Sequence, residues 1–186
     1  SRNLGLVRAR GELVAFLDAD DVWLPDMLRH HADILGRYPE AAFSYAPGCW
    51  WYGWTNRAED VERDFVQDTG VPPNRLVAAP GLLNLYLHNE AAVPSPSGMV
   101  FRRTALTAVD AWDEAFTGMY DDQVLYAKLG LRFPAYVSRE CLYLYRQHGG
   151  SLCARIVRKG SYLESRERFL VWLLAYLEEY GCACAE

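Results

Sequence analysis

The sequence predicts an α/β protein in which helices flank a mixed sheet. The first observation is an apolar run at residues 13–17, which begins after Gly11 and ends at a group of acids, as a buried strand would. The second is the alternation of helical and extended patterns through residues 1–46, which is typical of α/β units with parallel strands. The chain has 186 residues, which is the length of one domain that can bury a core.

Helical and extended patterns follow one another along most of the chain. Gly11 is expected to stop the first helix, Pro25 suits the first turn of the second, and Pro39 would end it near Tyr38. We expect helices at residues 1–10, 25–38, 81–88, 104–109 and 121–129, and strands at residues 12–17, 41–46, 99–101, 135–137 and 142–145.

Residues 47–80 break this alternation. They contain three tryptophans, a charged stretch and four prolines, and they show little periodicity. Long connections in compact domains are usually functional or disordered. Trp50, Trp51 and Trp54 are candidates for stacking on a ligand, and a core role for at least one of them is equally expected.

The last predicted element is an amphipathic helix. Ser161 followed by Glu164 has the spacing of a capping box, and Gly181 would end the helix. Its apolar stripe either covers a core or forms a homodimer, and it consists of Phe169, Leu170, Leu173, Leu174 and Leu177. We therefore divide the chain into a main part, residues 1–155, and a C-terminal helix and tail, residues 156–186.

Composition excludes several classes of protein. The net charge of -5 argues against a nucleic-acid partner. The five cysteines include no CxxC pair, which favours reduced thiols inside the cell, and Cys182 and Cys184 lie in an expected tail. No signal peptide and no apolar run of membrane-spanning length is present. We expect a cytoplasmic protein, either free or peripheral to the membrane.

Asp18 and Asp20 follow the first expected strand, at the end of the sheet where α/β proteins bind ligands. Carboxylates spaced in this way could converge on one cation, and Mg²⁺ usually combines one or two protein carboxylates with substrate phosphates. The pattern therefore suggests a site for a divalent metal, Mg²⁺ or Mn²⁺, and a diphosphate. A solvated turn, or a helix cap formed by Asp21 or Asp26, explains the same residues.

Three further features support a site, each with a simpler explanation. Adjacent carboxylates at Asp121 and Asp122 would raise each other's pKa, which suits a general base, but acids also stabilise the start of a helix. His148 follows an expected strand and is either a metal ligand or a surface residue. Gly98 would let a ligand approach the backbone or would simply form a turn. The remaining histidines are expected to be solvated: His30, His31 and His88.

Several segments taken together resemble one enzyme family. They are residues 2–6, 10–12, 14–26 with Asp-Ala-Asp-Asp at 18–21, 97–103, 112–116, 121–123, and 145–148 with Tyr-Arg-Gln-His. In this order they resemble the inverting family-2 glycosyltransferases, which have the GT-A fold. No single segment is specific, but the preserved order of several over roughly residues 1–155 is strong evidence.

The resemblance implies the C-terminal two-thirds of a GT-A domain, a Rossmann-like fold that binds nucleotide-diphospho-sugars. The implied reaction moves a sugar from a nucleotide-sugar to a glycan or other hydroxyl acceptor, with inversion. By the resemblance, Asp18 and Asp20 face the metal, Asp20 binds it directly, and His148 completes the metal or diphosphate site. Asp122 is the implied general base. The residues implied to line the donor site are Arg2, Asn3, Asp18 and Gly98.

The sequence departs from the family in two places. Asp121 stands where the family usually has Glu. The strands that hold the nucleoside in this family do not precede Ser1, which lies inside an expected helix. We therefore expect an N-terminally truncated chain that is inactive alone and exposes a sheet edge beside residues 13–17.

Two other functions explain part of the sequence. A catalytically inactive fragment could act as a sugar- or protein-binding module. A metal-dependent phosphoryl-transfer enzyme or nuclease would also use clustered acids, but it does not account for the Arg-x-His segment at residues 146–148. Thermal shift with nucleotides and Mn²⁺ distinguishes the three possibilities.

Overall fold

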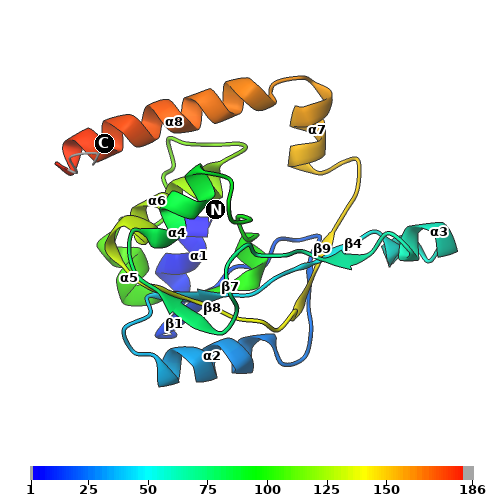
Figure 1. Cartoon of the computed structure of the whole chain (residues 1–186), viewed down its shortest axis with the longest axis horizontal. Coiled ribbons are helices and arrows are strands. Elements are labelled where there is room, and N and C mark those ends of the chain that lie inside the picture. The colour runs from blue at the N-terminus through cyan, green and yellow to red at the C-terminus, as the bar shows by residue number, and fades with distance from the viewer. Residues whose placement is uncertain (1, 182–186) are drawn as a thin grey trace.

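The computed structural model describes residues 2–181 (Figure 1). The α-helices are α1 (Arg2–Arg8), α2 (Met27–Arg37), α3 (Ala58–Val61), α4 (Gly81–Leu87), α5 (Arg103–Ala108), α6 (Asp121–Arg132), α7 (Leu152–Arg158) and α8 (Tyr162–Glu179). The strands are β1 (Leu13–Ala15), β2 (Val22–Trp23), β3 (Phe43–Tyr45), β4 (Cys49–Trp51), β5 (Phe65–Val66), β6 (Arg75–Val77), β7 (Met99–Arg102), β8 (Ala135–Val137) and β9 (Tyr143–Arg146). Two 3₁₀ turns are η1 (Gly53–Thr55) and η2 (Pro96–Gly98).

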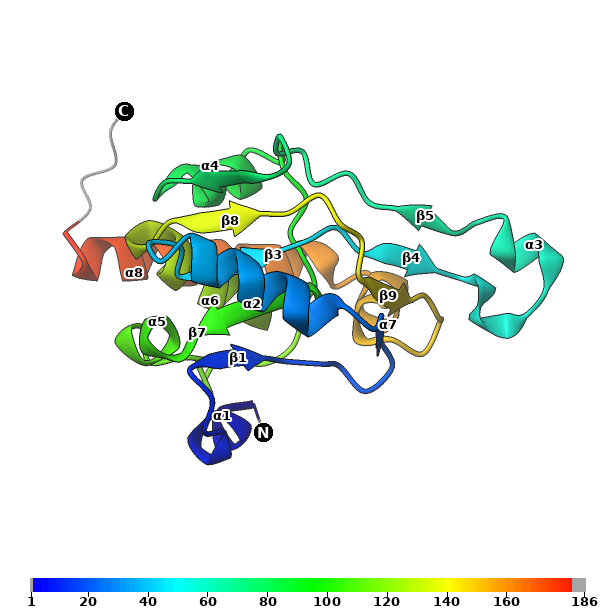
Figure 2. The ribbon, with the colours of Figure 1, turned by 90° about the horizontal axis from the view of Figure 1, so that it is seen from below.

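The strands form two mixed sheets. The larger sheet has the order β1-β7-β3-β8-β6, in which only β3 and β8 are parallel neighbours. The smaller sheet has the order β2-β9-β4-β5, in which only β9 and β4 are parallel neighbours. Because β4 follows β3 and β9 follows β8, the central parallel pairing continues from one sheet into the other, as Figure 2 shows.

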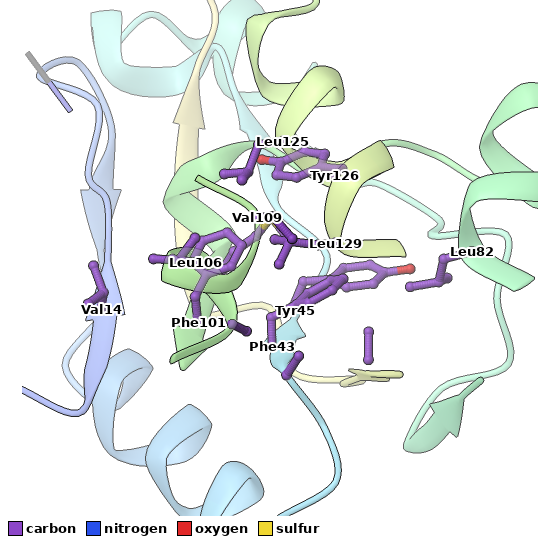
Figure 3. Close-up of a cluster of buried hydrophobic side chains, with 14 of the residues drawn as sticks. Val14, Phe43, Tyr45, Leu82, Phe101, Leu106, Val109, Leu125, Tyr126 and Leu129 are labelled. Atoms are coloured by element: carbon purple, nitrogen blue, oxygen red, sulfur yellow. The ribbon is translucent and has the colours of Figure 1, made fainter. Parts of the chain in front are cut away.

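Alternate residues of the central strands face opposite helical layers, as the period of a strand requires. Phe43 and Tyr45 of β3 and Phe101 of β7 join Leu106 of α5 and Leu125 of α6 in the main core (Figure 3). This core fills the space between the larger sheet and the helices α4, α5 and α6. It fixes α6, whose first turn carries the acids Asp121 and Asp122.

The opposite face of the larger sheet is covered by α2, which lies below it in Figure 1. Val100 and Tyr136 point to this side and pack against Met27 and other residues of the helix. His31 of α2 is fully buried, its Nδ1 lies 2.8 Å from the hydroxyl of Ser44, and burial lowers its pKa to about 3. The prediction that His31 is solvated is therefore wrong. His30 is half-buried and contacts the hydroxyl of Ser138, and His88 is exposed as predicted.

The C-terminal helix α8 packs on the body of the protein through half of its apolar stripe. Phe169 and Leu173 are buried in a cluster with Tyr120 and Val124, and the ring of Phe169 stacks on that of Tyr120 at 5.3 Å between centroids. Leu174, by contrast, is exposed. Dimerisation through the exposed half stays a prediction. The proposed division between residues 155 and 156 falls inside α7.

Every helix and strand expected from the sequence is present, within a few residues of its expected ends. The predicted parallel pairing of the first two units is wrong, because β7 lies between β1 and β3 and runs antiparallel to both. The expected sheet edge at β1 is confirmed. Residues 47–80 form β4, η1, α3, β5 and β6 rather than a loop without secondary structure.

Several predicted helix ends differ from the structure. Ser161 makes no side-chain cap, whereas the hydroxyl of Ser151 accepts a hydrogen bond from Ala154 and begins α7, a helix that the sequence pattern did not indicate. The first helix ends at Arg8, before Gly11. Cys182 and Cys184 lie outside the described residues. None of the helices within residues 2–181 combines the length and apolar character that crossing a bilayer requires.

Candidate active site

Residues 18–21, which we call the acid turn, connect β1 to β2. The backbone N–H of Asp21 donates to the carbonyl of Asp18, and the N–H of Asp18 donates to the hydroxyl of Ser97 at 3.1 Å. The indole N–H of Trp23 donates to the carbonyl of Ser97 at 2.7 Å. Because η2 leads into β7 and β7 pairs with β1, the sheet itself brings Ser97 to the acid turn.

The last strand, β9, anchors the acid turn from the other side. The backbone N–H of Arg146 donates to a carboxylate oxygen of Asp21 at 3.0 Å, and its side-chain Nε donates to the carbonyl of Asp20 at 2.7 Å. Asp21 is buried, and burial raises its pKa to about 6. Asp21 therefore stabilises the conformation of the turn. The other two carboxylates of the turn, those of Asp18 and Asp20, are more accessible.

Asp20 and His148 lie together, as the sequence predicted. Asp20 Oδ2 and His148 Nε2 are 2.9 Å apart, and both residues line a cavity of about 340 Å³ with Trp54 and Arg146. Two ligands at right angles around Mg²⁺ are about 3.0 Å apart, given metal–ligand distances of about 2.1 Å. The 2.9 Å distance is that of a direct hydrogen bond, and it is also close to the distance between adjacent ligands of one ion. No group of three or more His, Cys, Asp or Glu side chains that could hold a metal occurs within the part of the chain described.

Asp18 points to a different cavity, where Arg2 of α1 pairs with it. Arg2 Nη2 lies 2.8 Å from a carboxylate oxygen of Asp18, and Arg2 Nη1 lies 3.0 Å from one of Asp121. The guanidinium also stacks over the ring of Trp112 at 4.2 Å. These residues line a cavity of about 580 Å³ together with Asn3. Arg2 thus joins the acid turn to the first turn of α6.

The two acids at the start of α6 have different surroundings. Asp121 lines the 580 Å³ cavity and pairs with Arg2. Asp122 accepts a hydrogen bond from the N–H of Gln123 at 2.8 Å, and burial together with the charge of Asp121 raises its pKa to about 7. A carboxyl group with this pKa can exchange a proton near neutral pH. The predicted general base therefore has a suitable pKa, and its neighbour faces the cavity.

The two remaining predicted donor residues have structural roles in the described part of the chain. The side-chain amide of Asn3 donates to the backbone carbonyl of Trp112 and accepts from the backbone N–H of the same residue. Asn3 therefore positions one wall of the large cavity. A Cβ on Gly98 would lie 2.3 Å from the ring of Tyr143. The absence of a side chain at Gly98 is therefore explained by the packing of Tyr143, and an approach by ligand is not needed to account for it.

The three tryptophans of β4 and η1 lie near the end of β9. Trp50 stacks on Phe65 at 5.5 Å between centroids, and Trp51 and Trp54 lie on the guanidinium of Arg146. Only Trp54 lines the cavity that contains Asp20. Sequence reasoning missed the roles of Ser97, Arg146 and Trp112, although each lies within a segment that resembled the family. Their distance along the chain from Asp18 concealed the contacts.

Comparison with known proteins identifies the family and the fold. The model of the family described as "Glycosyltransferase like family 2" matches residues 1–179. The chain belongs to this family. Its membership supports sugar transfer as the class of reaction. No curated protein sequence matches the chain significantly.

Two solved structures show the same fold. The crystal structure of S. aureus TarS 1-349 superposes with a TM-score of 0.58 at 18% identity, covering 78% of this chain and 39% of that one. The crystal structure of S. aureus TarS gives a TM-score of 0.57 at 18% identity, covering 80% of this chain and 24% of that one. The chain therefore spans well under half the length of these structures. The predicted GT-A fold class is confirmed.

Proposed function

We propose that this glycosyltransferase domain transfers a sugar from a nucleotide-sugar to an acceptor hydroxyl, with inversion and with the help of a divalent metal. One observation carries the proposal. In the acid turn, Asp20 pairs with His148 and Asp18 pairs with Arg2. Arg2 also pairs with Asp121, which directly precedes Asp122. These contacts support the proposal, because they bring a pair of side chains that could hold a cation and the carboxyl group of Asp121 to adjoining cavities. Asp122, whose pKa is about 7, follows Asp121 at the start of α6.

Asp20 and His148 are the residues that would hold the metal. Their polar atoms have the spacing of adjacent ligands, and the substrate diphosphate and water would supply the others, as is common for Mg²⁺. When bound, the ion supplies positive charge next to the departing diphosphate. Arg2 pairs with both Asp18 and Asp121, so we assign it the role of positioning these two acids rather than of binding the diphosphate.

Asp122 is the proposed general base. The acceptor oxygen would attack the anomeric carbon as its proton passes to the Asp122 carboxylate, and the bond from that carbon to the diphosphate oxygen would break on the opposite side. A single displacement of this kind inverts the anomeric centre. The ionised form of Asp122 accepts the proton, so activity should rise with pH through the pKa of about 7.

The decisive test is calorimetric titration of UDP and dTDP, each with and without Mn²⁺, into the intact enzyme with its N-terminal strands. We expect metal-dependent binding of at least one nucleotide, and we expect Asp20→Asn to abolish it without changing the thermal unfolding temperature. Asp26→Asn is the matched control, because Asp26 is exposed and pairs only with the nearby Arg29. Unchanged metal-dependent affinity in Asp20→Asn would refute the metal assignment.

A further inference from the structure

A third cavity, of about 320 Å³, lies beside the acid turn and is not used by the proposed reaction. One wall comes from η1 and α3, which extend beyond the smaller sheet in Figure 2, and the other comes from the segment after β9. Trp54 and His148 line this cavity and also the one that contains Asp20. A ligand held here would therefore lie next to the proposed metal and diphosphate.

The wall formed by η1 is held in place by hydrogen bonds. A carboxylate oxygen of Asp64 accepts from the backbone N–H groups of Tyr52 and Gly53, at 2.6 and 2.9 Å. The indole N–H of Trp54 donates to the carbonyl of Gln147 at 2.9 Å, which ties the two walls together. A Cβ on Gly53 would lie 2.7 Å from a carboxylate oxygen of Asp64, so a side chain here would displace the carboxylate that accepts these hydrogen bonds. The cavity is therefore built by specific contacts, and its η1 and α3 wall lies outside the segments that resembled the family.

The polar side chains of the cavity favour an uncharged ligand. Arg63 Nη1 lies 3.0 Å from Asp60 Oδ1, and the hydroxyl of Thr55 donates to Asp60 Oδ2 at 2.7 Å. The hydrogen bond from Thr55 is the largest cause of the lowered pKa of Asp60, so this carboxyl stays ionised and cancels the charge of Arg63. A phosphate group would compete with Asp60 for Arg63, whereas the hydroxyl groups of a sugar can bond to both.

From this cavity we infer a subsite for one neutral sugar ring of the acceptor. The indole of Trp54 offers an apolar surface to the C–H face of a sugar, and Asp60 and Arg63 offer an acceptor and donors for its hydroxyls. The volume lies at the low end of the roughly 300–1,000 Å³ of small-molecule pockets, which suits a single ring. The role as an acceptor subsite rests on the proposed function, and the binding of a sugar does not.

The test is saturation-transfer NMR on the chain with methyl glucoside, methyl galactoside and methyl N-acetylglucosaminide. We expect at least one glycoside to bind, and we expect Arg63→Ala and Asp60→Asn each to weaken it about tenfold or more, as loss of a charged hydrogen bond does. Arg63 is 57% exposed in its side chain, so its replacement leaves the fold intact. Glu59→Gln is the matched control, because Glu59 lies on the same helix, is exposed and does not line the cavity.

Three results would overturn the subsite. They are binding of none of the three glycosides, equal binding by both variants and wild type, and displacement of the glycoside by inorganic phosphate. Asp20→Asn separates this inference from the proposed function. A glycoside signal that persists in Asp20→Asn while UDP binding is lost supports both. A glycoside signal in an intact wild-type enzyme that binds no nucleotide supports the sugar site and contradicts the proposed function.

Discussion

At the scale of single residues, Arg2 connects the two halves of the candidate site. It is the side chain that contacts both the acid turn and the acids of α6, through ion pairs with Asp18 and Asp121. Its positive charge lowers the pKa of Asp122, opposing the effects of burial and of Asp121. Arg2 should therefore influence the protonation of the base as well as the position of the acids.

In the intact enzyme, replacing Arg2 by Gln should move the acidic limb of the pH profile of kcat/KM to higher pH. Without the guanidinium, the charge of Asp121 raises the pKa of Asp122 further, so less of the base is ionised at neutral pH. Arg2→Lys keeps the positive charge and should shift the limb less. A profile for Arg2→Gln that is lower at every pH but unmoved would limit Arg2 to a structural role.

In the intact enzyme, replacing Asp122 by Asn should slow transfer by roughly 10²–10⁴-fold, with little change in nucleotide affinity. The comparison with Asp121→Asn identifies the base, because Asp121 faces the large cavity. A near wild-type rate for Asp122→Asn together with a large loss for Asp121→Asn would assign the base to Asp121.

Asp122→Asn should also change how the stability of the protein depends on pH. The pKa of Asp122 is raised from 3.8 to about 7 in the folded protein, so folding favours the protonated form. The stability that this preference provides is complete below pH 3.8 and is lost as pH rises to about 7. Asp122→Asn stays neutral, so its melting temperature should rise relative to wild type between pH 4 and 7 and keep that difference above pH 7. Melting curves at pH 4, 6 and 8 measure it.

At the scale of elements, the packing of Tyr143 on η2 supports the acid turn. A Cβ at Gly48 would lie 2.5 Å from the Tyr143 ring, and a Cβ at Gly98 would lie 2.3 Å from it. Tyr143 of β9 therefore packs closely against the backbone at both glycines. Because η2 carries Ser97, which bonds to Asp18 and Trp23, the close approach at Gly98 also determines where the acids lie.

Gly98→Ala should destabilise the protein by about 1–3 kcal/mol, the usual cost of overpacking a core. Urea denaturation measures this change. Gly36→Ala is the control, since Gly36 lies in α2 with no atom within 4 Å of the added Cβ, and alanine there should stabilise by about 0.5–1 kcal/mol. Equal stability of the two variants would show that Tyr143 can move aside.

The elements also show what the sequence can and cannot predict. Strong local patterns, such as the apolar run of β1 and the proline before α2, placed most helices and strands correctly. Strand order was not predictable, because β7 inserts between β1 and β3 from more than fifty residues away in the chain. Family resemblance indicated Asp20 and His148, whereas the bridging contacts of Arg2 and Arg146 depend on tertiary structure.

At the scale of the whole molecule, α8 is part of the body that positions α6. Leu173 is 3% exposed and packs near Tyr120 and Val124 at the start of α6, while the adjacent Leu174 is 59% exposed. Leu173→Ala should therefore cost about 2–5 kcal/mol in the free energy of unfolding, and Leu174→Ala should cost less than about 0.5 kcal/mol. Similar costs for the two variants, measured by urea denaturation, would mean that α8 does not contribute a fixed face to the core.

The contacts that build the candidate site join parts of the chain that are synthesised far apart. Arg2 and Asp121 are separated by 119 positions, and Asp20 and His148 by 128. Local helices can form early in folding, but contacts of this range must await the closure of long loops of the chain. During refolding, metal-dependent nucleotide binding should therefore recover later than helical circular dichroism. A nascent chain released before β9 would have the acids but not the arrangement that makes them a site.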